Sequence, residues 1–267
     1  MSELGCDPAR IDTSKPHPAR MYDYYLGGED NYEVDRAAAE QVMALSPDVV
    51  LSARANRDFL QRAVRAVARD GVDQIMDIGT GIPTSPNTHE AAHSVSPGIK
   101  VLYIDNDPIV SAYAGAKLIN SGNTGFFLGD LREPDAVLAH PELRRLLDLG
   151  RPVALLLVAV LHFINDEEDP AGLIAALTGP LPPGSRLVLS HATGDFHPDA
   201  DTGRGSEIYR KATAHLTMRS REQILPFFSG FDLLDPGLVQ ASRWQPDGPV
   251  PEALNGVAIY GGVGVKR

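Results

Sequence analysis

Short apolar runs alternate with helical patterns along most of the chain. A run such as 153–161, which is apolar throughout, is typical of a strand buried on both faces, whereas apolar positions three and four residues apart, as in 47–69, are typical of a helix. Because strands and helices alternate, we expect parallel strands joined by right-handed crossovers in an α/β fold. The predicted strands span 72–78, 100–105, 125–128, 153–161, 187–189, 231–234 and 257–265.

Two helices are predicted ahead of the first strand, at 35–45 and 47–69. For the second helix, Ser46 is expected to be the N-cap and Pro47 the first helical residue, and Gly71 lies just beyond its end. A stripe at helical spacing should face the core, and its members are Phe59, Leu60, Ala63, Val64 and Val67. Further helices are expected at 108–121, 134–149, 170–179 and 220–228, the last opened by a capping box of Ser220 and Gln223.

The N-terminal part of the chain has a different character. Residues 1–17 are expected to form a flexible arm, and the segment 18–32 carries four of the eight tyrosines around a glycine pair. Two interpretations of this segment stay open: the tyrosines fasten it to the domain surface, each hydroxyl finding a partner, or they form a lid over a ligand. We therefore divide the chain into an arm with a helical cap, 1–70, and an α/β domain, 71–267.

The stretch 75–84 is predicted to be a strand that runs into a ligand-binding loop. Gly79 and Gly81 permit a sharp turn and let a ligand touch the backbone, and Pro83 suits the first turn of a helix. The pattern D-x-G-x-G also occurs in turns that bind nothing, so a tight strand-to-helix connection is the alternative. About 20 residues farther on, a nucleotide-binding α/β unit carries an acid that binds ribose. Asp105 supplies that acid.

Polar residues follow the other predicted strands as well. Asp105 ends the second strand and Asp130 follows the third, while His162 and His191 follow the fourth and fifth. Open α/β sheets bind ligands in the crevice outside the carboxyl ends of their strands. We therefore expect these side chains to border one site.

These residues resemble class I S-adenosylmethionine-dependent methyltransferases, and in particular a bacterial family of such proteins long described as a domain of unknown function. The resemblance covers nearly the whole chain, through the motifs 18–28, 77–84, 103–108, 129–131 and 260–264. It implies a Rossmann-like, doubly wound sheet of seven strands, mostly parallel with the last strand antiparallel, next to an N-terminal helical cap. It also implies that S-adenosyl-L-methionine is the cofactor.

The resemblance further implies which residues bind the cofactor. By this resemblance, Asp77 and the backbone of the glycine loop cradle the methionine moiety, Asp105 binds the ribose, and Asp130 lies beside the adenine. The full set that it implies is Asp77, Gly79, Thr80, Gly81, Asp105, Asn106, Asp130 and Leu131. One departure from the family pattern is Pro83, which stands where a third glycine is common.

Arg20 is a further candidate, because the methionine end of the cofactor carries a carboxylate and neither the loop nor the strand-end acids offer a cation. A guanidinium can hold a carboxylate through two parallel hydrogen bonds. The tyrosines after Arg20 would exclude water, with Gly27 and Gly28 as the bend of a lid. The alternative is an ion pair at the surface between Arg20 and an acid such as Asp23.

Methyl transfer is an in-line displacement at a sulfonium-activated carbon, so the protein needs no covalent nucleophile. A base is needed only if the acceptor is protonated. His162 and His191 are the candidates, since imidazole titrates near neutrality. A structural role is the favoured alternative for each of them. The signature D/N-P-P-Y/F of amino-group methyltransferases is absent after the fourth strand, which favours a small-molecule acceptor.

The composition excludes several classes of protein. Lysine and arginine total 24 against 35 aspartates and glutamates, and the formal net charge of −11 argues against nucleic-acid binding and favours a small or cationic substrate. The single cysteine, Cys6, excludes an internal disulfide. With no apolar run near 18 residues, we expect a cytoplasmic protein that is neither exported nor bound to a membrane.

The pattern His89-Glu90-Ala91-Ala92-His93 matches the zinc motif H-E-x-x-H. Ser96 and Ile99 occupy the positions where a metzincin needs glycine and histidine, and no later acidic helix offers a third ligand. We therefore expect no metal.

Two other functions remain as alternatives to a methyltransferase. A nicotinamide-dependent oxidoreductase requires G-x-G-x-x-G, and Thr84 stands at the place of the third glycine. A catalytically silent module that only binds S-adenosylmethionine would share every binding residue. The sequence predicts neither the acceptor nor the oligomeric state.

Overall fold

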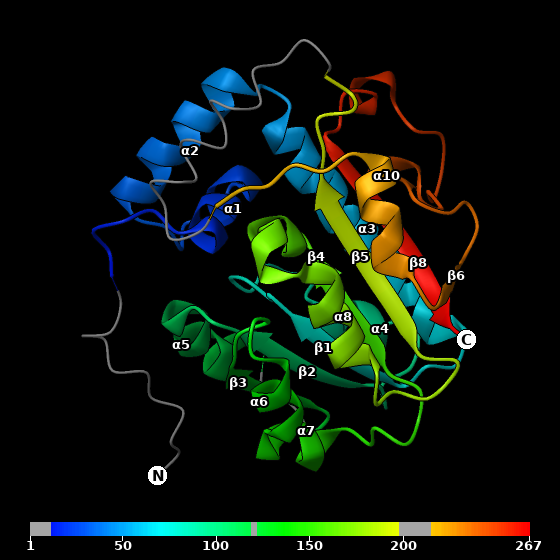
Figure 1. The fold of residues 1–267 in the computed structure, drawn as a ribbon. Helices are drawn as coiled ribbons and strands as arrows, with labels where there is room; N and C mark the ends of the chain where they lie inside the picture. The colour runs from blue at the N-terminus through cyan, green and yellow to red at the C-terminus, as the bar shows by residue number, and fades with distance from the viewer. Residues whose placement is uncertain (1–11, 119–121, 198–214) are drawn as a thin grey trace.

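The computed structural model describes residues 12–118, 122–197 and 215–267 (Figure 1). Cys6, most of the predicted flexible arm and the expected helix end at 121 lie outside the described residues. Among the helices of the described part, none is both long and apolar enough to cross a membrane.

The core of the protein is a mixed sheet with the strand order β3-β2-β1-β4-β5-β8-β6. The first five strands of the chain pair in parallel, and β8 pairs antiparallel with both β5 and β6. This confirms the predicted seven strands and their direction; a two-residue strand, β7, also pairs with β8 and was not predicted. The strands are β1 (Gln74–Ile78), β2 (Lys100–Asp105), β3 (Thr124–Leu128), β4 (Ala154–Val158), β5 (Arg186–Ala192), β6 (Phe231–Leu233), β7 (Val239–Gln240) and β8 (Ile259–Lys266).

Helices cover both faces of the sheet, because successive strand residues point to opposite sides and are apolar on each. Ile75 and Val101 pack with α3, α4 and α5, whereas Met76 and Leu102 pack with α6, α7, α8, α10 and η4. Figure 1 shows α3 and α8 on opposite sides of the sheet. These helices are α3 (Val49–Arg69), α4 (Thr88–His93), α5 (Pro108–Lys117), α6 (Pro134–Ala139), α7 (Pro141–Leu146), α8 (Pro170–Thr178), α10 (Arg221–Ile224) and η4 (Leu225–Phe228). Short 3-10 turns complete the described elements: η2 (Leu161–Phe163), η3 (Asp166–Glu168), η5 (Ala241–Arg243) and η6 (Glu252–Leu254).

Two helices, α1 (Pro18–Leu26) and α2 (Glu33–Leu45), precede α3 and form a third apolar cluster with its first turns. The glycine pair between α1 and α2 has a conformational reason. Gly27 has a φ of 83°, and a Cβ on Gly28 would lie 2.1 Å from Oδ1 of Asp23. The helix α3 packs against this cluster through Ala53 and against the sheet through Phe59. It therefore belongs to the packing of both parts of the chain, and the division at residue 70 stays a prediction.

The predicted start of α3 is wrong. Ser46 is the residue that ends α2, where its N–H donates to the carbonyl of Val42, and Pro47 lies in a turn. The helix begins at Val49, because the short connection between two packed helices uses Ser46, Pro47 and Asp48. The capping box of Ser220 and Gln223, by contrast, is present at the start of α10.

Candidate functional site

A cavity of about 560 Å³ lies at the carboxyl ends of the parallel strands, bordered also by α1 and α3. Its volume is within the range of small-molecule sites, roughly 300–1,000 Å³. Ten of the eleven side chains and loop residues predicted for the site line it: Arg20, Asp77, Gly79, Thr80, Gly81, Asp105, Asn106, Asp130, Leu131 and His162. His191 is not among the lining residues.

The loop after β1 depends on its two glycines. Gly79 and Gly81 have φ values of 75° and 67°, in the left-handed region that favours glycine. A Cβ on Gly79 would lie 2.6 Å from Cγ2 of Val160, whereas a Cβ on Gly81 would meet nothing within 4 Å. The Gly79 N–H donates to the carbonyl of Ile104 (2.8 Å), and the Thr80 hydroxyl donates to that of Asp77 (3.0 Å). The loop is therefore tied to β1 and β2, and Gly81 leaves open space beside it.

Pro83 does not begin a helix, so that prediction is wrong. The next helix, α4, starts at Thr88, five residues later, because Asn87 and Glu90 form its capping box. The intervening stretch is held from α3: the guanidinium of Arg57 donates to the carbonyls of Thr84 and of Pro86 (2.8 Å).

Asp77 and Asp105 are buried carboxylates at the ends of β1 and β2. Asp77 accepts from the Thr88 hydroxyl (2.6 Å), and Asp105 accepts from the N–H groups of Gly81 (2.7 Å) and Asp107 (2.9 Å). Burial raises the pKa of each to about 6, because the desolvation of the charged form outweighs these hydrogen bonds. A ligand that donates hydrogen bonds to these two carboxylates would therefore stabilise their ionised forms.

Asp130 follows β3 and is more exposed than the other two acids. Burial opposes its ionised form, but hydrogen bonds from the N–H of Arg132 (2.9 Å) and the amide of Asn106 (2.9 Å), together with the charge of Arg132, hold its pKa below the usual value. The buried side chain of Leu131 lies beside it in the chain. Asn106 and Asp130 therefore join the loops after β2 and β3 on one side of the cavity.

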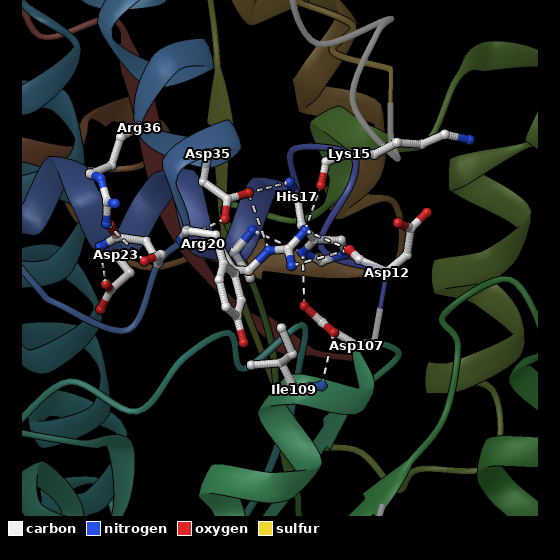
Figure 2. A network of polar contacts seen from close by, with 12 residues as sticks. Asp12, Lys15, His17, Arg20, Asp23, Asp35, Arg36, Asp107 and Ile109 are labelled. Carbon is white, nitrogen blue, oxygen red and sulfur yellow. Dashed lines mark hydrogen bonds and ion pairs between the residues drawn. The ribbon is translucent and has the colours of Figure 1, made fainter. Parts of the chain in front are cut away.

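Arg20 lies on α1 within the polar network of Figure 2 and is almost fully buried. Its Nε lies 3.2 Å from Oδ1 of Asp35, and its terminal nitrogens donate to the carbonyls of Asp12 (3.3 Å) and Lys15 (2.7 Å). Nearby, Nδ1 of His17 lies 3.0 Å from Oδ2 of Asp107, at the start of α5. Arg20 thus borders the cavity, but its charge is already paired with a fully buried carboxylate.

Arg57 is a site residue that the sequence analysis missed. It lines the cavity beside Asp77, whose ionised form its charge favours. Its Nε is buried without a hydrogen-bond partner, and no carboxylate within the described residues forms an ion pair with it. The sequence contains one indication of this role. Arg57 lies four positions after Ala53 and three before Leu60, so a charged side chain stands at helical spacing on the apolar face of α3.

Tyr22 connects α1 to α3 and, through it, to the sheet. Its hydroxyl donates to the carbonyl of Ala53 (2.9 Å) and accepts from the amide of Asn56 (2.9 Å). The Ser190 hydroxyl donates to the amide oxygen of Asn56 (2.5 Å) and accepts from the N–H of Ala159 (2.8 Å). Tyr22 also lines the cavity, so it both fastens the segment and borders the ligand space.

The two candidate histidines occupy different positions. His162 lines the cavity, and its Nδ1 accepts from the N–H of Ala192 (3.3 Å). His191 uses both ring nitrogens: Nδ1 donates to the carbonyl of Ala192 (2.7 Å), and Nε2 accepts from Arg219 (2.9 Å). Burial lowers the pKa of His191 to about 4 and that of His162 well below its usual value. Both ring nitrogens of His191 are therefore used within the fold, and its role stays a prediction.

The H-E-x-x-H residues are each used within the fold. His89 contacts the Tyr103 hydroxyl (2.7 Å), His93 contacts the carbonyl of Ile99 (2.8 Å), and Glu90 accepts from Asn87 at the start of α4. In the part of the chain that the structure describes, no three or more acidic, histidine or cysteine side chains are grouped so that they could hold a metal ion.

Comparison with solved structures shows two close relatives of the chain. A DUF574 family protein from Streptomyces avermitilis is 41% identical, with a TM-score of 0.93 over 97% of this chain and 100% of the other. A candidate methyltransferase from Thermobifida fusca is 37% identical, with a TM-score of 0.91 over 97% and 98%. Human N-acetylserotonin methyltransferase, solved with S-adenosylmethionine, shares the fold at 15% identity, with a TM-score of 0.51 over 92% of this chain and 62% of the other.

Among curated proteins, none matches the chain. Residues 5–267 match the family model of the S-adenosyl methyltransferases, which therefore spans the cavity and every strand around it. This agrees with the sheet order and with the polar residues at the strand ends. The chain thus belongs to the S-adenosyl methyltransferase family, and its cofactor is S-adenosylmethionine.

Proposed function

We propose that the protein catalyses the transfer of a methyl group from S-adenosylmethionine to a small molecule held in the same cavity. The observation that carries this proposal is that one cavity has two chemically different ends. Its polar end is formed by the loops after β1, β2 and β3, and its apolar end lies where α1 and α2 meet the residues after β4.

The residues at the polar end fit the cofactor. The buried carboxylate of Asp105 would accept hydrogen bonds from ribose hydroxyls, which favour its ionised form. The open space beside Gly81 would admit the methionine moiety against the loop backbone. Asn106 and Asp130 would border the adenine. When bound, the cofactor supplies a methyl group on a positively charged sulfur, which is already activated for displacement.

Two arginines have different roles in this proposal. Arg57 has no carboxylate partner among the described residues and lies beside Asp77 and the glycine loop, so it is suited to the methionine carboxylate. Arg20 is paired with Asp35 and holds the carbonyls of Asp12 and Lys15, so it is suited to fastening the segment that closes the site. Arg20 would then support cofactor binding through closure, whereas the sequence analysis expected a direct contact.

The apolar end supports a small-molecule acceptor. Side chains from α1, α2 and the segments after β4 and before α10 line it, among them Tyr25, Val42, Phe163 and Leu216. An acceptor must fit beneath α1 to reach the methyl group, and the net charge of −11 opposes binding of a polyanion such as nucleic acid. Enclosure also excludes water, which strengthens the electrostatic contacts made there.

Binding and transfer can be tested separately. Calorimetry should detect S-adenosylmethionine and not NAD, and Asp105→Ala should weaken binding by about 1.5–3 kcal/mol because a charge-assisted ribose contact is lost. Incubation with methyl-labelled cofactor and a small-molecule extract should then label a product that mass spectrometry can identify. Binding without any transfer would contradict the proposed catalysis and support a silent binding module, and unchanged affinity in Asp105→Ala would contradict the ribose contact.

A further inference from the structure

His162 lies at the acceptor side of the cavity. It belongs to η2, which directly follows β4, and its ring contacts the backbone of Ala192 at the end of β5. In the sheet order, β4 and β5 lie beyond β1, whereas the loops that fit the cofactor follow β1, β2 and β3. A group held by His162 would therefore lie nearer to the residues proposed to hold the methionine end of the cofactor than to those proposed to border its adenine.

The hydrogen bond from Ala192 defines the state of the imidazole. A nitrogen that accepts an N–H has its lone pair in use, so in neutral His162 the proton resides on Nε2. The charged and titratable groups next to the ring are His191, whose ring centroid lies 5.6 Å away, and Arg219. Because neither neighbour stabilises an imidazolium and the ring is 6% exposed, His162 stays neutral and offers an N–H donor. Within the described residues, the one hydrogen bond of the ring is the one at Nδ1, so Nε2 is left for a ligand in the cavity that His162 lines.

Arg219 is a buried cation beside His162. It is 3% exposed and donates to the carbonyls of Leu161 (3.3 Å) and Ile164 (2.8 Å), on either side of His162 in the chain. Its Nε (3.0 Å) and one terminal nitrogen (2.6 Å) donate to Asp166, whose side chain is 75% exposed, so water screens part of this ion pair. Four buried carboxylates line the cavity: Asp23 on α1, Asp77 and Asp105 at the ends of β1 and β2, and Asp107 at the start of α5. None of them belongs to the segment after β4 that carries His162.

From this arrangement we infer that the acceptor is an oxygen acid that binds as its anion, a carboxylate or an ionised phenol or enol, and that Nε2–H of His162 holds the anionic oxygen. The inference rests on the proposed function. An oxygen lone pair forms the new O–C bond while the C–S bond breaks, and the sulfur keeps the bonding electrons. The anion and the sulfonium both become neutral, so no proton has to be removed and no base is required.

This assignment reverses the expected role of His162, from base to hydrogen-bond donor. It also differs from the expectation that an acidic chain prefers a cationic substrate. The charge of −11 describes the whole surface, whereas an oxygen held at His162 lies next to the dipole of its ring and near the buried Arg219. The apolar side chains around His162, such as Phe163 and Leu216, would take up the carbon skeleton of the acid.

The tautomer can be measured without knowing the acceptor. In protein labelled with ¹⁵N-histidine, long-range proton–nitrogen spectra distinguish the two ring nitrogens and report their protonation. His162, assigned by loss of its signals in His162→Gln, should carry its proton on Nε2 and stay neutral between about pH 5.5 and 8. A proton on Nδ1, or titration within this range, would overturn the assignment and restore the role of a base.

The acceptor class can be measured with simple probes on protein saturated with S-adenosylhomocysteine. Benzoate should bind at millimolar concentration, and benzylamine, which has a similar size and the opposite charge, should bind at least about tenfold more weakly. The variant His162→Gln keeps an N–H donor and should retain benzoate binding. The variant His162→Phe keeps a ring but has no N–H donor, so its affinity for benzoate should fall about tenfold.

Equal binding of the two probes, no benzoate binding, or a His162→Phe protein that binds benzoate like the parent would contradict the inference. Failure of the proposed function has a different signature. In that case the cofactor would bind but no small molecule would be methylated, while the His162 tautomer and the binding of benzoate would still be as inferred. The two ideas can therefore fail separately.

Discussion

The role of Arg57 can be tested by changing the protein and the ligand together. Arg57→Ala removes the one guanidinium beside Asp77 that lacks a carboxylate partner in the described chain, and Arg20→Ala removes the guanidinium that is paired with Asp35. The two matched ligands are S-adenosylhomocysteine, which carries the amino-acid carboxylate, and methylthioadenosine, which lacks the amino-acid end. Each variant is measured against each ligand, so that the contact with the carboxylate is isolated as a coupling term.

The size of the effect follows from the chemistry of the contact. A hydrogen bond between a charged donor and a carboxylate contributes about 1.5–3 kcal/mol, which corresponds to a factor of roughly ten to one hundred and fifty in affinity. Arg57 also holds the carbonyls of Thr84 and Pro86, so its removal loosens the glycine loop for both ligands. Because a looser loop weakens both ligands alike, its effect cancels in the ratio of the two affinities. The ratio then reports only the contact between Arg57 and the ligand carboxylate.

Calorimetry at one pH and salt concentration provides two affinities for each variant, which are compared with the two affinities of the parent protein. Arg57→Ala should weaken S-adenosylhomocysteine by this factor relative to methylthioadenosine, and Arg57→Lys should recover part of the loss, because lysine keeps the charge without the planar fork. Arg20→Ala should weaken both ligands alike, since it acts through closure. If Arg20→Ala instead weakens only S-adenosylhomocysteine, Arg20 is the cation for the carboxylate and the reasoning from its pairing with Asp35 is refuted.

Three further predictions concern pH, the closing segment and the glycine loop. Burial raises the pKa of Asp105 to about 6 and the ribose favours its ionised form, so calorimetry should find full cofactor affinity above about pH 7 and about tenfold weaker binding at pH 5, with a smaller slope in Asp105→Asn. Tyr22→Phe should lower the free energy of unfolding in urea by about 1–3 kcal/mol, because a buried amide loses its partner. Tyr24→Phe, which removes an exposed hydrogen bond to a carboxylate, should change it by less than about 1 kcal/mol; equal effects would refute the buried role. Gly79→Ala should lower the melting temperature more than Gly81→Ala, since only the first adds a clash to the strained φ, and Gly81→Ala should mainly weaken cofactor binding; the reverse order would contradict the loop geometry.

The sheet was predictable because its strands are buried on both faces and therefore stand out as apolar runs. The acids at the strand ends were accessible in the same way, since Asp77 and Asp105 lie within the last two residues of β1 and β2 and Asp130 lies two residues after β3. Helix starts were predicted less well. Both Pro47 and Pro83 suit the first turn of a helix, yet each lies in a connection whose course is determined by packing.

The contacts of the site were less accessible to sequence reasoning, because they join residues far apart in the chain. Arg57 belongs to the site only because α3 passes beside the carbonyls of Thr84 and Pro86. The state of His162 depends on the N–H of Ala192, which β5 brings against η2. A histidine after a strand looks the same in the sequence whether it accepts or donates, so only the structure indicates the direction of its hydrogen bond.

The fastening of α1 has a consequence for the speed of the reaction. His17 contacts the start of α5, Arg20 is paired with α2, and Tyr22 is bonded to α3, so one short helix that borders the cavity is held from three directions. Exchange of spent for fresh cofactor past this helix requires these contacts to break together. Turnover would then be limited by how often α1 opens, and the residence time of the cofactor product would rise with each added contact.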